Sequence, residues 1–564
     1  MGEMLLGYPV VPFLVGAVGV ALLGRRVGAI IMVLAPLVAL AQMVALEPGA
    51  LAVTVDYYDF PLDPIRVDRL SLAFGYVFAA AATLAGLYGM RMMATGEQVA
   101  ALVYAGAAVG VVFAGDLMTF FIFWELKAVA SAIVIMMRRT ATAGRAAMRY
   151  LFVHVAGGSA LLAGVLWHYA QTGSLAFTAF ELTGATALIA LACLVNTAAP
   201  PLHGWLPDAY PKASVVGTVL LSAYTTKAAV YALARGFAGH EPLLWVGVFM
   251  ALYGVMYAMM QDDIRKLLAY HIVSQVGFMV AAVGIGTPDA INGAVAHAFA
   301  HILYKGLLLM GTGAVLYATG RSLSSRLGGL ARYLPWVLVF YMVGAVSISG
   351  VPGFSGFVSK ELVIHAASEE GLSNAVLLLK IASVGTFLST ALKLPYATWF
   401  ATPAPKYRPD AAWTPPLRKP GVEMMAAMAL AAAANIAIGV HPDLLWDLLP
   451  SVNTYTPFSP PKLVETTQLL LLTVLGFWLW KKHLSPKIGT VLDVDWWYRV
   501  APGRLAATIA GRGPAPRDTG EPRGTEVRRP QESVPSVPAI TPTWVLGTVV
   551  FAAAVLIVIV SLPS

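Results

Sequence analysis

The chain has 564 residues, of which 58% are apolar and 12% are charged, and its mean hydropathy is +0.74. Soluble globular domains carry about 25% charged residues, so this composition excludes an ordinary water-soluble fold. The net charge of +8 follows from basic loops and not from a nucleic-acid site, so we expect no nucleic-acid partner. The single cysteine, Cys193, excludes a disulfide framework and a cysteine metal cluster.

Apolar stretches long enough to cross a bilayer recur along the whole chain. A span needs about 20 apolar residues, and the length and pattern predict about sixteen transmembrane helices in an all-α polytopic membrane protein. We expect them at 4–24, 27–45, 69–92, 95–114, 116–137, 148–170, 183–199, 214–236, 243–261, 266–286, 289–319, 334–368, 372–400, 420–440, 464–480 and 542–561. The first stretch lacks a basic leader and a small-residue cleavage site, so we interpret it as a retained helix.

The charges of the loops alternate with the predicted spans. Odd-numbered loops carry basic residues, such as Arg25 with Arg26 and Arg138 with Arg139, whereas even-numbered loops are acidic, for example at Glu369. Cytoplasmic loops are enriched in Lys and Arg. The alternation therefore predicts an external N-terminus and cytoplasmic odd-numbered loops.

Ionisable residues lie near the centres of three predicted spans: Glu125 in the fifth, Lys227 in the eighth and Lys305 in the eleventh. A charge in the bilayer costs several kcal/mol unless it is paired or hydrated, so each marks a candidate functional site. His297 and His301 precede Lys305 on the same helical face. Because imidazole titrates near neutral pH, this stripe is a candidate proton relay. The alternative is a buried ion pair that only holds helices together.

Other polar residues of the spans carry weaker indications. His154 and His168 lie toward span ends and are interpreted as structural. Lys393 lies about two turns from the cytoplasmic end of its span, where it either joins a relay or extends to the membrane surface. Lys127 and Lys380 have no assigned role.

Two spans are predicted to break within the membrane. The seventh runs into Pro200-Pro201, and the twelfth contains SGVPGFSG. Such residues free backbone carbonyls, which a membrane tolerates where the backbone lines a hydrated cavity. Each break falls in the fourth helix of a five-helix unit, spans 4–8 and 9–13, and a lysine follows on each fifth helix, Lys227 or Lys393. Because five is odd, the second unit crosses in the opposite sense, which predicts two inverted repeats.

This pattern divides the chain into six segments. They are a three-helix segment with an external hairpin loop (1–94), the first repeat (95–261), the second repeat (262–400), additional helices (401–480), a cytoplasmic polar and amphipathic segment (481–541) and a C-terminal transmembrane helix (542–564).

Several stretches resemble the antiporter-like subunits shared by Mrp-type cation/proton antiporters and respiratory complex I, and most of all the D-type Mrp subunit. They are FFIFWE (120–125), PLHGWLPDAYP (201–211), LSAYTTKAAVYALAR (221–235), DDIRKLLAYHIVSQVGF (262–278), AHAFAHILYKGLLLMGTGAV (296–315) and GVPGFSGFVSKEL (350–362). They occur in the family's order. The resemblance implies a helical core with two inverted five-helix repeats and a central chain of buried charges that moves protons.

By position, the resemblance also implies roles for single residues. Glu125 is similar to the family's fifth-helix glutamate, Lys227 to its eighth-helix lysine and Lys305 to its central lysine. Lys360 is similar to a twelfth-helix residue that is Lys or Glu in the family. His297 and His301 resemble the histidines that precede the central lysine.

One position departs from the family pattern. The family usually carries a lysine five residues before the PLHxWLPDA element, and this chain has Asn196 there. Because asparagine does not titrate, the family's Glu–Lys pair lacks its usual base. Either Lys227 or Lys127 pairs with Glu125 instead, or this half conducts differently.

We therefore predict a proton-translocating subunit of an Mrp-type cation/proton antiporter, with Na⁺ as the expected cation, in the cytoplasmic membrane of a prokaryote among other membrane subunits. Protons are expected to enter near Glu125 and Lys227, pass Lys305 and leave near Lys360 or Lys393. No phosphate loop, nucleophile triad or metal-spaced His/Cys cluster occurs, so no cofactor and no metal is expected.

Two alternatives stay open. In the first, the chain is a proton-pumping subunit of a complex I-like oxidoreductase or membrane-bound hydrogenase. In the second, it is a membrane subunit of an inorganic-carbon uptake system. Whether it belongs to an enzyme complex is therefore not decided by the sequence.

Overall fold

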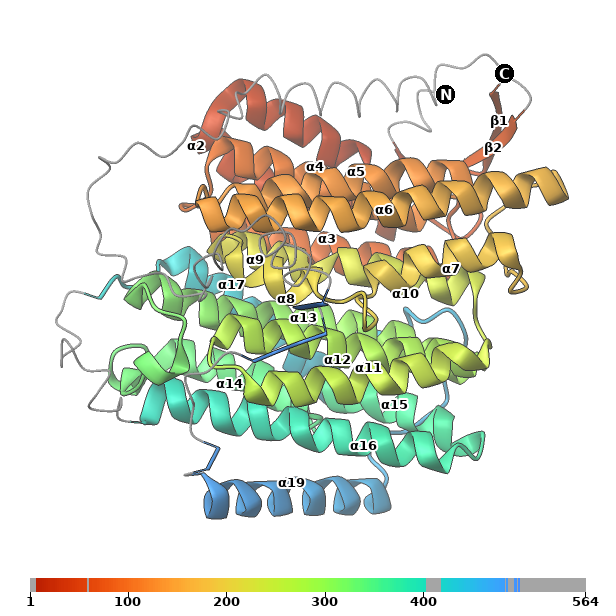
Figure 1. Cartoon of the computed structure of the whole chain (residues 1–564). Helices are drawn as coiled ribbons and strands as arrows, with labels where there is room; N and C mark the ends of the chain where they lie inside the picture. Colours follow the sequence, from red (N-terminus) through yellow and green to blue (C-terminus); the bar gives the residue numbers. More distant parts are fainter. Residues whose placement is uncertain are drawn as a thin grey trace, which may run out of the picture.

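The computed structural model describes residues 7–57, 60–401, 417–481, 483–484, 491–494 and 496–497. The predicted sixteenth span at 542–561 and most of the polar segment 481–541 lie outside these residues. In Figure 1 the long helices run roughly parallel, with α2 at one edge of the bundle and α19 at the other, and α17 lies out of sequence order beside α3 and α13.

The N-terminal part contains the described strands. Helix α2 (Val11–Val44) covers the first two predicted spans, which join across a kink at Gly24, where φ is 78°. Strands β1 (Val53–Tyr57) and β2 (Phe60–Ile65) pair antiparallel in the segment predicted as a hairpin. Helix α3 (Arg69–Gly89) follows, and the carboxylate of Asp68 caps its N-terminus by accepting from the Ser71 amide.

The next group of helices corresponds to spans 4–8. It consists of α4 (Thr95–Phe113), α5 (Leu117–Met136), α6 (Ala141–Thr172), α7 (Gly184–Asn196), α8 (Trp205–Ala209), the 3₁₀ turn η1 (Tyr210–Lys212), α9 (Val215–Ala223) and α10 (Thr225–Gly236). Helix α7 ends before the prolines, where a break is predicted, and Ala198 then adopts a φ of 60°. A second interruption, at Tyr224, separates α9 from α10 and was not predicted.

The following group corresponds to spans 9–15. It consists of α11 (Glu241–Met260), α12 (Ile264–Ile285), α13 (Pro288–Thr319), η2 (Ser324–Arg326), η3 (Leu330–Arg332), α14 (Pro335–Ser349), α15 (Ser355–Glu369), α16 (Ser373–Phe387), η4 (Leu388–Lys393), η5 (Tyr396–Phe400), α17 (Val422–Val440), α18 (Asp443–Trp446) and α19 (Pro460–Trp480). The interruption between α14 and α15 lies at the SGVPGFSG stretch. The last part of α16 continues as π-helix through η4 and η5.

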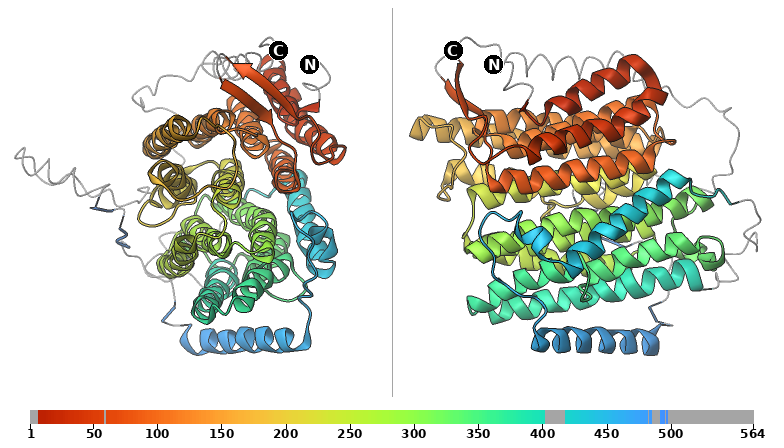
Figure 2. Two further views of the ribbon diagram at one scale, coloured as in Figure 1. Left: turned by 90° about the vertical axis from the view of Figure 1, so that its right-hand side faces the viewer. Right: turned by 180° about the vertical axis from the view of Figure 1, so that it is seen from behind.

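The described residues form twelve helices that are long and apolar enough to cross a membrane, and α7 and α14 are shorter apolar helices. The chain is thus a multi-pass membrane protein. The apolar windows of α4, α12 and α9–α10 are 94% buried and that of α13 is 89% buried, so these helices form the interior. The window of α19 is only 6% buried, and the end-on view of Figure 2 shows α19 crossing the edge of the bundle at a tilt. Polar residues on the interior helices are therefore shielded from lipid.

Candidate functional site

Helix α13 carries a stripe of polar side chains through the interior. Lys305, His301 and His297 are all fully buried. His297 lies 3.1 Å from the Ser359 hydroxyl through Nδ1 and 3.4 Å from the Tyr304 hydroxyl through Nε2. Among the described residues, Lys305 Nζ and both ring nitrogens of His301 have no hydrogen-bond partner. Buried polar groups normally have a hydrogen-bond partner, so these three nitrogen atoms are available to hydrogen-bond with water or to exchange a proton.

Lys227 is held at the interruption of the eighth span. Helices α9 and α10 are separated at Tyr224, and the Ser222 carbonyl lies in the last turn of α9, where carbonyls lack an intrahelical partner. Lys227 Nζ donates to this carbonyl at 2.8 Å and to the Thr226 hydroxyl at 3.1 Å. Its charge acts on Lys305 and on His301, so the structure brings the predicted residues of the eighth and eleventh spans together.

A chain of hydroxyl groups lies beside Lys227. The Thr225 hydroxyl lies 2.6 Å from that of Tyr104 and 3.1 Å from that of Tyr150, which accepts from Ser131 at 2.8 Å. All four residues are buried. This chain links α4, α5, α6 and α10, and it was not predicted because single hydroxyls in a span do not differ from ordinary packing residues.

Glu125 on α5 packs against a glycine pair of α6. A Cβ on Gly158 would lie 1.7 Å from Glu125 Oε1, and a Cβ on Gly157 would lie 3.9 Å from the amide nitrogen of Asn196 on α7. The two glycines therefore stand between the glutamate and the residue that replaces the family lysine. Asn196 is fully buried and donates to the Ala192 carbonyl at 3.3 Å.

Neither candidate base forms an ion pair with Glu125 within the described residues. Lys127 is buried with its ammonium 3.6 Å from the ring centroid of Trp124, although its charge still acts on Glu125. Lys227 is directed to the Ser222 carbonyl instead. The Oε1 atom of Glu125 is buried without a hydrogen-bond partner in the described part of the chain.

Lys360 lies beside the interruption between α14 and α15, as Lys227 lies beside the interruption at Tyr224. It lies on α15, directly after the break, and its Nζ donates to the free Ile348 carbonyl at 2.7 Å and to Ser383 at 3.2 Å. Lys393, at the end of η4, is buried, and its ammonium donates to the carbonyl of Met259 at the end of α11. Both lysines thus hold carbonyls that helix ends leave unpaired.

Helix α12 supplies residues that the sequence analysis did not single out. His271 Nε2 lies 2.7 Å from the Ser389 hydroxyl, and the charges of Lys305, Lys360 and Lys393 all act on this imidazole. Gln275 donates to Thr386 at 3.4 Å. The position of His271 within the tenth predicted span (266–286) was a usable indication. The His271 side chain connects the stripe on α13 with the lysines near α16.

A separate polar cluster lies at the break after α7. His203 Nε2 is 3.0 Å from a carboxylate oxygen of Asp493, which also accepts from the hydroxyls of Tyr253 and Tyr270. Burial raises the pKa of Asp493, but the hydrogen bond and charge of His203 together with the two hydroxyls outweigh this effect and lower the pKa to about 2. This cluster fastens part of the polar segment 481–541 to the bundle.

Comparison with known proteins adds to this geometry. Residues 114–389 match the family model described as "NADH:quinone oxidoreductase/Mrp antiporter, TM". These residues belong to the antiporter-like family. The matched region contains α5 to α16, and therefore Glu125, Lys227, Lys305 and Lys360.

Individual relatives agree with this assignment. The A-type subunit of the Na(+)/H(+) antiporter of Alkalihalophilus pseudofirmus is 30% identical over 68% of this chain and 53% of its own length. The D-type subunit of the Na(+)/H(+) antiporter from the same organism is 34% identical over 46% of this chain and 56% of its own length. A chain in the structure of the Mrp complex from Dietzia sp. DQ12-45-1b is 25% identical, with a TM-score of 0.71 over 83% of this chain and 100% of that chain. This chain thus spans about half the length of the curated relatives it matches.

Proposed function

We propose that this chain is a proton-translocating subunit of an Mrp-type cation/proton antiporter. The observation that carries the proposal is the row of buried basic groups through the interior: Lys227, His301, Lys305, His271 and Lys360. Interior charges are expensive in a membrane and mark ion or proton pathways. Relatives that are named as subunits of Na(+)/H(+) antiporters support the same conclusion.

The row can pass protons because its members act on one another. Like charges that are close together in a low dielectric cannot all be present, so a proton gained by one lysine favours loss from its neighbour. We propose that protons enter near Glu125 and Lys227, cross at Lys305 with His301 and His297, and leave near Lys360 or Lys393. In this path His271 lies between the central lysine, Lys305, and the lysines at the exit, Lys360 and Lys393.

The first half then operates without the family's seventh-helix lysine. We propose Lys127 as the electrostatic partner of Glu125, because its charge acts on that carboxylate from the same helix. Asn196, across the glycine pair of α6, is a polar neighbour that does not titrate.

The finer architecture belongs to the same proposal. It comprises sixteen spans with an external N-terminus in the cytoplasmic membrane of a prokaryote, two inverted repeats at 95–261 and 262–400, other membrane proteins of the complex as partners and Na⁺ as the exchanged cation. The repeats are supported by the fact that both fifth helices are irregular beside their lysines. Lys227 follows the interruption at Tyr224, and Lys393 ends the π-helical segment η4.

The test is a transport assay on everted vesicles that carry the complete complex. We expect Lys305→Ala to abolish cation-dependent proton movement while the complex assembles. The matched control is Lys419→Ala, which removes an exposed lysine before α17. Full transport by an assembled Lys305→Ala complex would overturn the proposal.

A further inference from the structure

Helix α19 is attached to the bundle through charged side chains. Its apolar window is only 6% buried, yet it carries Glu465 and Lys462 on the side that faces α15 and α16. Glu465 forms an ion pair with Lys380 of α16. Lys462 lies 3.7 Å from the carboxylate of Glu361 on α15 and 3.8 Å from that of Glu465. A helix that only bordered lipid would need none of these charges.

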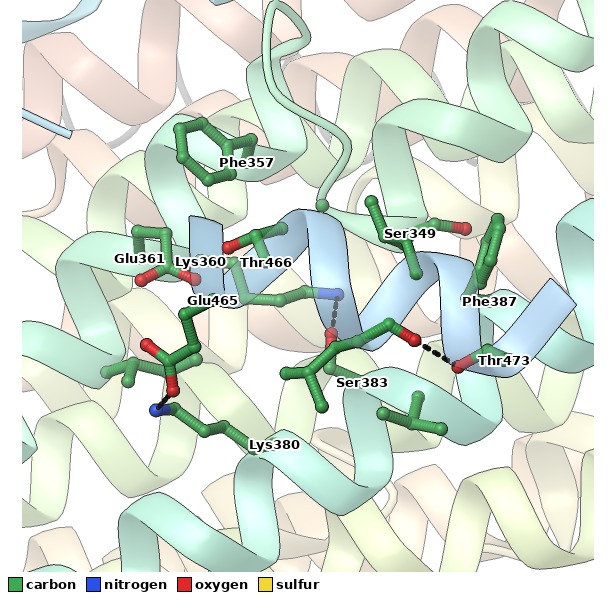
Figure 3. A pocket seen from close by; sticks show the side chains of 15 residues that line it. Ser349, Phe357, Lys360, Glu361, Lys380, Ser383, Phe387, Glu465, Thr466 and Thr473 are labelled. Atoms are coloured by element: carbon green, nitrogen blue, oxygen red, sulfur yellow. Dashed lines mark hydrogen bonds and ion pairs between the residues drawn. The ribbon is translucent and has the colours of Figure 1, made fainter. Parts of the chain in front are cut away.

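The charged side chains surround a cavity. It measures about 40 Å³ and is lined by residues that include Lys360, Glu361, Lys380, Ser383, Glu465 and Thr466. Figure 3 shows these side chains converging from α15, α16 and α19. A polar cavity needs about 10–15 Å³ of such volume to hold one water molecule, so this one accommodates at least two.

The cavity begins at the last lysine of the row. Lys360 Nζ donates to Ser383 at 3.2 Å, and both residues line the cavity. Glu361 is 9% exposed, and its Oε2 atom has no hydrogen-bond partner in the described part of the chain. A hydroxyl group, a carboxylate oxygen that is ion-paired with Lys462 but accepts no hydrogen bond, and room for water thus follow one another from Lys360 toward α19.

We propose that this cavity is the proton-release site of the chain and that Glu465 and Glu361 are its terminal proton acceptors, which makes α19 part of the transport path. The proposal rests on the proposed function. The Lys360 ammonium gives one proton to cavity water, and the proton passes to a carboxylate, which becomes neutral. Its partner, Lys380 or Lys462, then lacks a counter-charge, and this favours loss of the proton to bulk water and return of the ion pair.

The first experiment compares variants of α19 in the assembled complex. Glu465→Gln is expected to lower proton transport at least tenfold, and Glu465→Asp, which keeps a carboxylate, to retain part of it. Gln468→Leu, on the exposed side of the same helix, is the control. If Lys305→Ala blocks transport and Glu465→Gln does not, the release site is wrong and the proposed function stands. If Lys305→Ala itself transports, the proposed function fails.

A paired substitution separates a proton acceptor from a structural ion pair. Lys380→Met with Glu465→Leu replaces the ion pair by apolar side chains of similar size, which usually leaves packing intact. A release site predicts that this double variant loses transport as Glu465→Gln does. Transport at the wild-type rate would show that the pair only fastens α19, and would overturn the proposal.

Thiol labelling tests the cavity without measuring transport. Cys193 is the single cysteine, so a Cys193→Ser background allows one cysteine to be placed at a chosen position. We expect Thr466→Cys, which lines the cavity, to react with a small membrane-impermeant cationic reagent. Leu471, whose side chain is 64% exposed on α19, lies toward lipid, so Leu471→Cys is expected not to react. Absence of reaction at position 466 would overturn the proposal.

Discussion

The contact between Gly158 and Glu125 gives the sharpest prediction for the first half of the path. A Cβ on Gly158 would lie 1.7 Å from Glu125 Oε1 and 2.6 Å from its carboxyl carbon, whereas ordinary contacts begin at 3.4 Å. In Gly158→Ala the carboxylate must therefore move by about 1.7 Å (3.4 minus 1.7) or α6 must move away from α5. A misplacement of about 1 Å can lower a rate about 100-fold, whereas the cost in stability is small, because the displaced atoms are the far end of a flexible side chain.

The neighbouring glycine provides the matched control. A Cβ on Gly157 would meet Val195 at 3.4 Å and Asn196 at 3.9 Å, both ordinary contacts. We therefore expect Gly158→Ala to lower proton transport by about 10- to 100-fold in everted vesicles, and Gly157→Ala to transport normally, with both complexes assembled. Equal transport by the two variants would refute the account of Glu125, because the displaced carboxylate would then have no role.

Further predictions concern the polar cluster after α7, the cap of α3 and the tenth span. Asp493→Asn should make the chain at residues 491–494 more susceptible to proteolysis at neutral pH. Because the pKa of Asp493 is lowered to about 2, docking in the unmodified chain should be present above about pH 4 and fade only as the pH falls toward 2. Protection of Asp493→Asn at pH 7 would contradict this. Asp68→Ala should lower the unfolding temperature of the purified complex, since it removes an N-cap worth about 1 kcal/mol and leaves the buried guanidinium of Arg235 without its carboxylate; an unchanged midpoint would contradict the cap's contribution. His271→Ala should slow proton transport in assembled complexes, and a normal rate would remove His271 from the row.

The sequence was sufficient to predict the helices and the central charges because both depend on local composition. Long apolar stretches must span a bilayer, and ionisable residues at their centres are conspicuous. Pro200-Pro201 and the glycines near Pro352 likewise lie where helices α7 and α14 end. The interruption at Tyr224 was not predictable, because AYTTK contains neither Gly nor Pro. The break is stabilised by a tertiary hydrogen bond from the Thr225 amide to the Tyr104 hydroxyl and by a local one from Lys227 to the Ser222 carbonyl.

The partners of the charges required the structure. Lys380 had no assigned role because its partner, Glu465, lies 85 residues later in the chain. The sequence does not show which helices α19 packs against. Lys127 likewise had no assigned role, because its stacking on Trp124 depends on local side-chain geometry. Lys393 was open between a relay and a surface position; its side chain is buried, and its ammonium donates to the Met259 carbonyl at the end of α11, next to the loop that carries Asp262.

Chemical rescue at position 305 tests the central claim, a wetted row of basic groups, most directly. In the Cys193→Ser background, Lys305→Cys should abolish proton transport, and treatment with 2-bromoethylamine, which converts the thiol into a lysine-like amine, should restore it. The account predicts no recovery with a neutral ethylating reagent of similar size. Unimpaired transport before treatment, equal recovery with the neutral reagent, or failure of the amine to restore transport would contradict it.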